Sequence, residues 1–248
     1  MTRRRPFVVG ITQARMNSSR LPGKILLEAA GKPLLQHHVE RLSRARTLDL
    51  HVLATTDMPA DDPVEDLGKR LGVPVVRGSE TDVLDRFYRA ASAHGAEVAV
   101  RFTGDCPLID PGLVDDLLTL FLTSEPALDY ACIDVNRLPR GLDAEAMSRA
   151  ALDEAWAQAD QPFEREHVTP YIYHRPDRFR LDLLSLEGPA DQHRWCVDTA
   201  EDLELVRRLL DALLPGNPGF GWRDCLDILR DHPDWVELNR GVAQKPLM

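Results

Sequence analysis

Short β-rich runs alternate with helical patterns along the first half of the chain, and this alternation restricts the folds that the sequence can adopt. Runs rich in β-branched and aromatic residues predict strands at residues 7–12, 51–55, 73–76 and 98–102. The segments between and after them predict helices at residues 33–44, 64–71, 83–94 and 113–122. Repeated strand–helix units predict an α/β fold with a mostly parallel sheet that binds ligands outside the carboxyl ends of its strands.

The rhythm is less regular after about residue 128. Here the patterns predict strands at residues 129–133 and 179–183, with another ending at 195–197, and helices at 149–158, 164–173 and 203–214. A loop that contains Pro and Gly lies near residues 137–141. We expect the site of an acceptor substrate in this irregular half, apart from the ligand site at the strand ends of the first half.

Composition excludes several classes of protein. The formal net charge of −10 argues against general nucleic-acid binding, which needs clustered Lys and Arg. No apolar run approaches the roughly 20 residues that cross a bilayer. The basic cluster at residues 3–5 is not followed by a signal-peptide apolar stretch, so we expect a cytoplasmic protein. The four cysteines show no C-x-x-C spacing, which predicts reduced thiols and neither a zinc site nor a redox centre.

A turn-rich basic loop follows the first predicted strand, at Gln13–Lys24. Its cations, Arg15, Arg20 and Lys24, can neutralise phosphate oxygens, the arginines in bidentate fashion and the lysine as a point charge. Backbone N–H groups of such a loop add fixed dipoles that favour an anion. The loop therefore predicts a triphosphate site, and as part of an exposed loop Lys24 is expected to contribute little to thermal stability.

This loop is not a Walker motif. Ile25 follows the Gly-Lys pair where a hydroxyl residue would bind the metal, and Ser18 stands where the leading Gly would be needed. The alternative interpretation of the loop is a solvated basic segment with a turn at Pro22–Gly23.

The loop and several later segments carry a resemblance to a known family. The string from Gln13 to Lys24 resembles the Q-A-R-x-x-S-x-R-L-P-G-K loop of the cytidylyltransferase-like family of spore-coat polysaccharide synthesis, which is related to the CMP-KDO and CMP-acylneuraminate synthetases. Further matching segments follow in the expected order, at residues 78–80, 82–87, 104–109, 141–145, 165–170 and 197–199. The resemblance thus covers most of the chain.

The resemblance implies a single nucleotide-diphospho-sugar transferase domain, of the Rossmann-like GT-A type, over residues 1–248. It places the nucleotide-binding part at about 6–125 and an acceptor and dimerisation part at about 126–215. It also implies a CTP donor, Mg²⁺, a small anionic acceptor such as an acidic sugar, and a homodimer. Some relatives activate phosphonates, so the acceptor stays open.

The resemblance assigns the nucleotide to the loop and to a later segment. The loop residues expected to bind it are Gln13, Ala14, Arg15, Ser18, Ser19, Arg20 and Lys24. Ser79, Glu80 and Asp82 are candidates for recognition of the base or ribose. The alternative interpretation of this second group is a turn and a helix cap.

Two aspartates are candidate magnesium ligands. Asp105 and Asp198 each follow a predicted strand, where a parallel sheet presents side chains to its ligands. Magnesium usually takes one or two carboxylates and completes its coordination with water and phosphate oxygens. By resemblance Asp105 and Asp198 are the ligands, and with Arg15 and Lys24 they form the expected catalytic group. The alternative is helix capping, which Asp110 and Asp198 could each perform.

The acceptor site is expected to include both acidic and basic side chains. Alternation predicts that Asp143 and Glu145 project to one face of an extended segment, where they could bind sugar hydroxyls or form an ordinary polar face. The candidate acceptor residues are Arg137, Arg140, Asp143, Glu145, Glu166 and His167. His167 is expected to organise the site and not to act as a base. The adjacent His37 and His38 face different directions on a helix, so neither is interpreted as a metal ligand.

Three other functions compete with a cytidylyltransferase. A sugar-1-phosphate nucleotidyltransferase would be expected to have a Gly-Gly-rich opening, which this loop lacks. A metal-dependent glycosyltransferase commonly has a D-x-D pair, whereas Gly104-Asp105-Cys106 offers one carboxylate. A non-catalytic nucleotide-binding protein would not need both metal carboxylates and the cationic loop.

The resemblance predicts that CTP binds more tightly than UTP, ATP or GTP. The segment from Ser79 to Arg86 lies where the resembled family contacts the nucleoside. Isothermal calorimetry with each nucleotide and Mg²⁺ measures this preference. Tighter binding of UTP or ATP would contradict the donor assignment.

Overall fold

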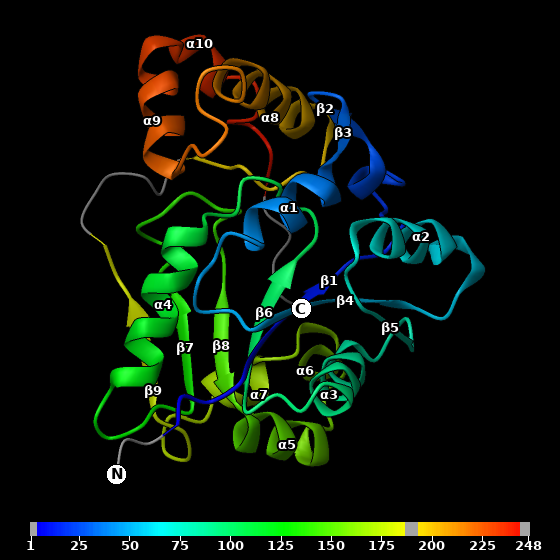
Figure 1. The fold of residues 1–248 in the computed structure, drawn as a ribbon, viewed down its shortest axis with the longest axis vertical. Coiled ribbons are helices and arrows are strands. Elements are labelled where there is room, and N and C mark those ends of the chain that lie inside the picture. Colours follow the sequence, from blue (N-terminus) through cyan, green and yellow to red (C-terminus); the bar gives the residue numbers. More distant parts are fainter. Residues whose placement is uncertain (1–3, 187–192, 244–248) are drawn as a thin grey trace.

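A seven-stranded sheet runs through the structure, a computed structural model that describes residues 4–186 and 193–243 (Figure 1). In spatial order its strands are β5 (Val75–Gly78), β4 (Leu50–Thr56), β1 (Val8–Gln13), β6 (Val98–Thr103), β8 (Glu145–Ser148), β7 (Tyr130–Ile133) and β9 (Leu181–Leu184). Strand β8 runs antiparallel to both neighbours, and the other pairings are parallel. The expected mostly parallel α/β sheet is thus confirmed.

Helices cover both faces of this sheet. The longer ones are α1 (Leu34–Leu42), α2 (Asp62–Leu71), α3 (Val83–Ala93), α4 (Pro111–Thr123), α5 (Arg149–Gln158), α8 (Ala200–Leu213) and α9 (Trp222–Asp231). The short elements are α6 (Pro162–His167), α7 (Pro170–Tyr173), α10 (Pro233–Val236), the 3₁₀ turns η1 (Lys24–Leu26) and η2 (Pro59–Asp61), and the hairpin strands β2 (Glu28–Ala29) and β3 (Lys32–Pro33). Within the described residues, no helix combines the length and the apolar character needed to span a membrane.

Buried apolar side chains divide between the two faces of the sheet. On one face, apolar residues of α4, α8 and α9 belong to the same buried cluster as Val100 and Phe102 of β6. On the other face α3, α5 and α7 pack against Ile11 of β1 and Met147 of β8. Strand β1 is buried along almost its whole length because it lies inside the sheet and has helices on both sides. Helices α8, α9 and α10 gather at one end of the molecule (Figure 1).

Two predicted elements are wrong. The helix expected over residues 164–173 is divided into α6 and α7, because Val168 between them has a φ of 74° and Pro170 can begin a helix but not continue one. The strand expected to end at residues 195–197 is an irregular segment, tied to the sheet side by an isolated bridge between Arg140 and Arg194. Strand β8 and helices α9 and α10 were not predicted.

A buried chain of hydrogen bonds joins the first strands to the turn after β6. Thr12 Oγ1 lies 2.9 Å from His38 Nε2 and 2.8 Å from His51 Nε2, and His38 Nδ1 donates to the carbonyl of Cys106 at 2.9 Å. Because a neutral imidazole donates from one nitrogen only, Thr12 must donate to His38 and accept from His51. Burial lowers the pKa of His38 to about 4 and that of His51 to about 3.

The low pKa of His51 predicts a loss of stability in mild acid. The unfolded chain protonates this imidazole below about pH 6.5, whereas the folded chain keeps it neutral down to about pH 3. The contribution of His51 to the free energy of unfolding is therefore fully present above about pH 6.5 and decreases as the pH falls below that value. Wild type should lose about 2 kcal/mol more of its free energy of unfolding than His51→Leu between pH 7.5 and pH 5. Urea unfolding at both pH values measures this difference, and equal losses in the two proteins would refute it.

Candidate active site

The basic loop is closed on itself and anchored from the side. The Met16 carbonyl accepts hydrogen bonds from the backbone N–H groups of Ser18, at 3.0 Å, and Gly23, at 2.9 Å. Gly23 has a φ of 68°, a left-handed conformation that favours glycine. The buried Asp61 carboxylate accepts from the Met16 N–H at 2.6 Å. These contacts give the loop a defined shape at the carboxyl end of β1.

A cavity of about 420 Å³, here called the loop cavity, lies between this loop and the end of β6. All seven loop residues predicted to bind the nucleotide line it: Gln13, Ala14, Arg15, Ser18, Ser19, Arg20 and Lys24. Arg86 adds a cation that the sequence interpretation had not singled out, although it belongs to the matching 82–87 segment. Arg86 is 2% exposed as a residue, and its guanidinium donates to the Ser79 and Glu80 carbonyls. The cavity therefore concentrates positive charge around a space of nucleotide-phosphate size.

The second predicted group of nucleotide residues lies beside this cavity and does not line it within the described residues. The Asp82 carboxylate caps α3 by accepting from the Asp85 N–H at 2.9 Å, and it pairs with Arg165 at 2.6 Å. Ser79 Oγ accepts from the Asp82 N–H at 3.2 Å. Glu80 accepts from the Asn17 side chain at 3.1 Å. The structure thus gives Ser79 and Asp82 the turn and cap arrangement, and Glu80 supports the loop.

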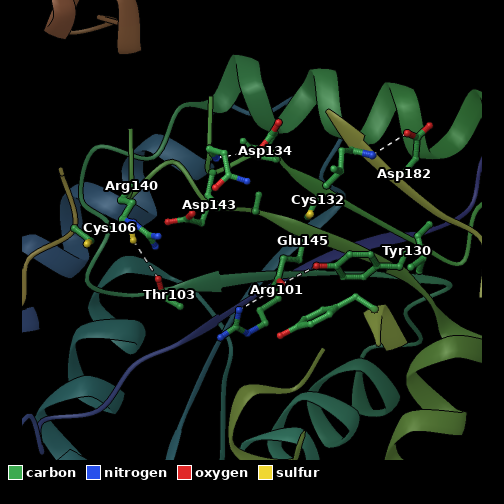
Figure 2. Close-up of a pocket in the computed structure, with 18 of the residues that line it drawn as sticks. Arg101, Thr103, Cys106, Tyr130, Cys132, Asp134, Arg140, Asp143, Glu145 and Asp182 are labelled. Carbon is green, nitrogen blue, oxygen red and sulfur yellow. Dashed lines mark hydrogen bonds and ion pairs between the residues drawn. The ribbon is translucent and has the colours of Figure 1, made fainter. Parts of the chain in front are cut away.

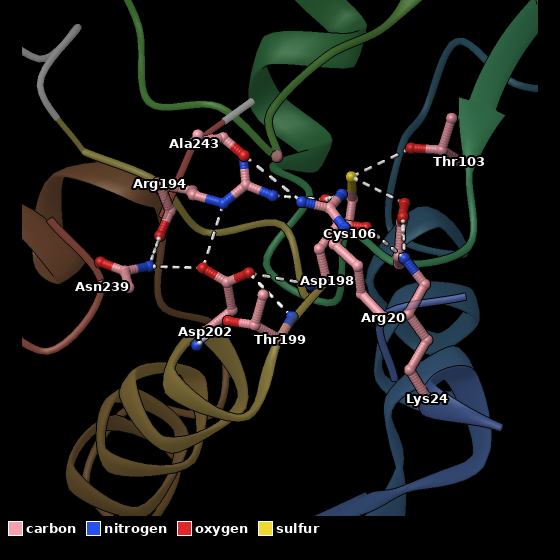
Figure 3. A network of polar contacts seen from close by, with 12 residues as sticks. Arg20, Lys24, Thr103, Cys106, Arg194, Asp198, Thr199, Asp202, Asn239 and Ala243 are labelled. Carbon is pink, nitrogen blue, oxygen red and sulfur yellow. Dashed lines mark hydrogen bonds and ion pairs between the residues drawn. The ribbon is translucent and has the colours of Figure 1, made fainter. Parts of the chain in front are cut away.

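Lys24 joins the two predicted metal carboxylates, and Figure 3 shows Lys24 and Asp198 in this network. Its Nζ donates to Asp105 Oδ2 at 2.6 Å and to Asp198 Oδ1 at 2.7 Å. The residue is 8% exposed, so the expectation of an exposed lysine is wrong. The physical reason is that η1 begins at Lys24 and directs its side chain inward, where the carboxylates compensate for its desolvation. The ammonium lies on the wall of the loop cavity.

The ion pairs reverse the effect of burial on both partners. Burial opposes the charged form of Lys24, but Asp105 and Asp198 outweigh it and raise the pKa of the ammonium. Burial also opposes the charged form of Asp105, and Lys24 outweighs it and lowers the pKa of that carboxyl. Both groups are therefore ionised at neutral pH.

Backbone contacts fix the two aspartates relative to each other. Gly104 donates from its N–H to the Gln13 carbonyl at 2.8 Å, and a side chain at this glycine would meet Ala14 and Gln13 at 3.0–3.1 Å. The Asp105 carbonyl accepts from the Val197 N–H at 2.8 Å. This last bond fastens the segment that carries Asp198 to the end of β6.

Helix capping does not explain Asp198. Thr199 is the N-cap of α8, and its side chain and that of Asp202 form a capping box. Asp110, by contrast, caps α4 by accepting from the N–H groups of Gly112 at 2.8 Å and Leu113 at 3.1 Å. The Asp198 carboxylate instead forms ion pairs with Lys24, with Arg194 and, at 2.6 Å, with Arg20.

A larger cavity of about 790 Å³, here called the sheet cavity, lies against β6, β8, β7 and β9 (Figure 2). Asp143 and Glu145 both line it, as their alternation predicted. Glu145 pairs with Arg101 and accepts from the Tyr130 hydroxyl at 2.8 Å, so its charge is compensated. Burial raises the pKa of Asp143. Arg140 also lines the cavity and forms no ion pair with a described residue.

Gly141 brings the segment that carries Asp143, just before β8, against the segment before Asp198. It has a φ of 101°, and a side chain there would meet the backbone of Trp195 and Cys196 at 2.6–2.7 Å. The Trp195 N–H donates to the Arg140 carbonyl at 2.7 Å. A glycine at this position is therefore required for the close approach.

Three of the candidate acceptor residues lie elsewhere. Arg137 is exposed and does not line the sheet cavity within the described part of the chain. Glu166 and His167 line the loop cavity instead, because α6 packs beside α3. Burial lowers the pKa of His167, which favours the neutral imidazole.

The cysteines are thiols with no metal-binding arrangement. All four lie within the described residues and are free. Cys106, Cys132 and Cys196 line the sheet cavity, and burial raises the pKa of each, that of Cys132 to about 11. Within residues 4–186 and 193–243 there is no cluster of three or more His, Cys, Asp or Glu that could hold a metal.

The Asp105 and Asp198 pair suits magnesium better than zinc. One oxygen from each carboxylate already lies within 2.7 Å of a single cationic atom, Lys24 Nζ, so the two oxygens converge on one point. Magnesium is commonly held by one or two carboxylates with water and phosphate oxygens, whereas structural zinc needs four protein ligands. The residues present therefore fit a magnesium ion that is shared with a phosphate.

Comparisons with known proteins show similarity over most of the chain. Residues 9–216 match the family model described as Cytidylyltransferase. The chain is 34% identical over 236 residues to the spore coat polysaccharide biosynthesis protein SpsF of Bacillus subtilis, covering 92% of this chain and 95% of the relative. It is 29% identical over 253 residues to a 3-deoxy-manno-octulosonate cytidylyltransferase of Solibacter usitatus, covering 86% and 98%.

A solved structure of a cytidylyltransferase from Leptospira borgpetersenii superimposes with a TM-score of 0.88 at 30% identity, over 96% of this chain and 99% of that one. These similarities confirm the resemblance that the motifs predicted.

The buried position of Lys24 predicts that Lys24→Met destabilises the protein. Asp105 would lose its cation while remaining largely desolvated, which should lower the free energy of unfolding by about 2 kcal/mol. Lys32→Met is the matched control, because Lys32 pairs with Glu40 where both side chains are at least 40% exposed, and it should cost less than about 0.5 kcal/mol. Urea unfolding at pH 7 measures both variants. Similar small effects would show that Lys24 has no stabilising role.

Proposed function

Because the chain belongs to the cytidylyltransferase family, and is therefore a CTP-dependent nucleotidyltransferase, we propose that it transfers CMP from CTP to an acidic sugar or similar small anionic acceptor in polysaccharide or glycoconjugate biosynthesis. The acceptor oxygen attacks the α-phosphorus of CTP. The bond from that phosphorus to the bridging β-phosphate oxygen breaks, and pyrophosphate leaves with the electron pair.

One observation carries this proposal: the loop cavity and the sheet cavity share Thr103, Asp105 and Asp198 as lining residues. A basic cavity suited to phosphates thus meets a second, larger cavity at the carboxylates. Transfer between two substrates requires such a junction, because the acceptor oxygen must reach the α-phosphorus of the bound donor.

We assign the triphosphate to the loop cavity. Arg15, Arg20 and Arg86 surround it with fixed positive charge. Charge on the departing pyrophosphate grows during the reaction, and preorganised cations lower the barrier where that charge develops. Lys24 contributes from the boundary with the carboxylates.

We assign a magnesium ion to Asp105 and Asp198. When bound, the ion would neutralise phosphate oxygens and orient the triphosphate. The Lys24 ammonium lies between the same carboxylates and on the wall of the loop cavity, so Lys24 would have to give up part of this position to an ion held by Asp105 and Asp198 and could then pair with a phosphate. The two carboxylates and Lys24 then retain charge balance around the phosphates.

We assign the acceptor to the sheet cavity. Arg140 is the cation there that can pair with an acidic group of the acceptor, since Arg101 is already neutralised by Glu145. Asp143 and Glu145 offer carboxylate oxygens to sugar hydroxyls. Glu166 and His167 border the donor side, and Arg137 has no part in this assignment.

The function is tested by pyrophosphate release with each nucleoside triphosphate against a panel of acidic sugars, sugar phosphates and phosphonates. We expect turnover with CTP and an acidic sugar. Turnover confined to phosphonates or sugar phosphates would reassign the acceptor. Absence of turnover together with tight CTP binding would favour a nucleotide-binding protein without catalysis.

Removal of either proposed metal carboxylate should abolish most activity. Asp105→Asn and Asp198→Asn nearly preserve shape but remove charge, and each should lower kcat by about 10²-fold or more. Asp227→Asn, at an exposed position of α9, is the matched control and should leave kcat unchanged. Circular dichroism checks that each variant is folded. A folded Asp105 or Asp198 variant with wild-type kcat would remove that residue from the proposed metal site.

A further inference from the structure

The described residues after 216 lie beyond the range of the family model, and they contact residues beside Asp198 in the candidate active site. Residues 9–216 match the family, whereas α9, α10 and the described residues up to 243 follow that range. Trp222, Cys225 and Leu229 of α9 are buried in the same apolar core as Val206 and Leu209 of α8. The segment is therefore an integral part of the structure.

Asn239 is the buried polar side chain at the end of this segment. It is 5% exposed, although its neighbours Leu238 and Arg240 are more accessible. Its amide nitrogen donates to the Arg194 carbonyl at 2.8 Å and to Asp202 Oδ1 at 2.8 Å. Both N–H bonds of the amide are thus used, and both go to residues beside Asp198 (Figure 3).

Asp202 links Asn239 to the backbone of Asp198 through hydrogen bonds. Its Oδ2 accepts from the N–H of Asp198 at 2.9 Å and from that of Thr199 at 3.1 Å. Its Oδ1 accepts from Arg194 Nε at 3.1 Å as well as from Asn239. The Asp202 side chain is fully buried, so a lost donor cannot be replaced by bulk water.

Arg194 transmits the contact to the Asp198 carboxylate. Its terminal nitrogen pairs with Asp198 Oδ2, the oxygen that Arg20 also binds at 2.6 Å. The other oxygen, Oδ1, is directed at Lys24 and hence toward Asp105. The arginines therefore hold one oxygen of Asp198 and leave the other to the cation that both aspartates share.

We propose that Asn239 is a positioning residue for Asp198: by fixing Arg194 and Asp202 it sets the orientation of the carboxylate that binds the metal. This inference rests on the proposed function. Partners that orient metal ligands commonly contribute 10- to 100-fold to metal affinity or activity. The segment that follows residue 216 would thus complete the proposed metal site.

The test compares full-length Asn239→Ser, which keeps one hydroxyl donor, and Asn239→Ala, which keeps none, with wild type. Mn²⁺ binding is followed by electron paramagnetic resonance without nucleotide, and CTP binding by calorimetry with Mg²⁺ and with EDTA. We expect Asn239→Ala to bind Mn²⁺ and Mg²⁺–CTP about 10-fold more weakly and Asn239→Ser to be intermediate. Affinity for CTP in EDTA should stay the same.

Arg240→Ala is the matched control, because Arg240 is exposed and pairs with the exposed Glu237; it should match wild type in every measurement. Equal weakening of CTP in Mg²⁺ and in EDTA would indicate general structural damage and overturn the proposal, as would unchanged metal affinity in the alanine variant. If Asn239→Ala does not fold, Asn239→Ser decides: at least about 3-fold weaker Mn²⁺ binding supports the proposal, and wild-type binding overturns it. Failure of wild type itself to bind CTP with metal would instead refute the proposed function.

Discussion

The arrangement of the candidate active site depends on the ion pairs of Lys24 with Asp105 and Asp198. They join the loop after β1, the turn after β6 and the segment before α8, which are distant in sequence. A buried charge is tolerated only where an opposite charge compensates for its desolvation, so each of the three segments depends on the other two. The resulting junction lies where the loop cavity and the sheet cavity meet.

The surrounding structure limits how far these charges can move. Asp61 fastens the basic loop, and the bond from the Val197 N–H to the Asp105 carbonyl fastens the two acidic segments to each other. The buried hydrogen bonds through Thr12 and His38 fasten the turn after β6 at the Cys106 carbonyl. A set of charges that is fixed before the substrates arrive needs little reorganisation during phosphoryl transfer, which is where electrostatic catalysis gains most.

Some of the site was predictable because its residues are close in sequence or lie at strand ends. The basic loop from Gln13 to Lys24 lines one cavity as expected, since a contiguous loop keeps its residues together. Asp143 and Glu145 line the other, since alternate residues of an extended segment share a face. The helix over 164–173 was mispredicted because apolar spacing gave no sign of the left-handed Val168 that ends α6. Glu166 and His167 line the loop cavity because α6 packs beside α3, a tertiary contact that no local pattern indicates.

The sequence by itself determined the α/β alternation, the cationic character of the loop and the family, because periodicity, residue chemistry and motif order are local or linear properties. Only the tertiary structure decided which charges neutralise one another. Lys24 could be assigned from the sequence to phosphate or to solvent, and folding placed it between two carboxylates. Asn239 carried no signal at all, because its role arises from packing of α9 and α10 against α8, which brings its amide to Arg194 and Asp202. Long-range pairing of buried polar groups depends on where the whole chain places them, and no local pattern encodes it.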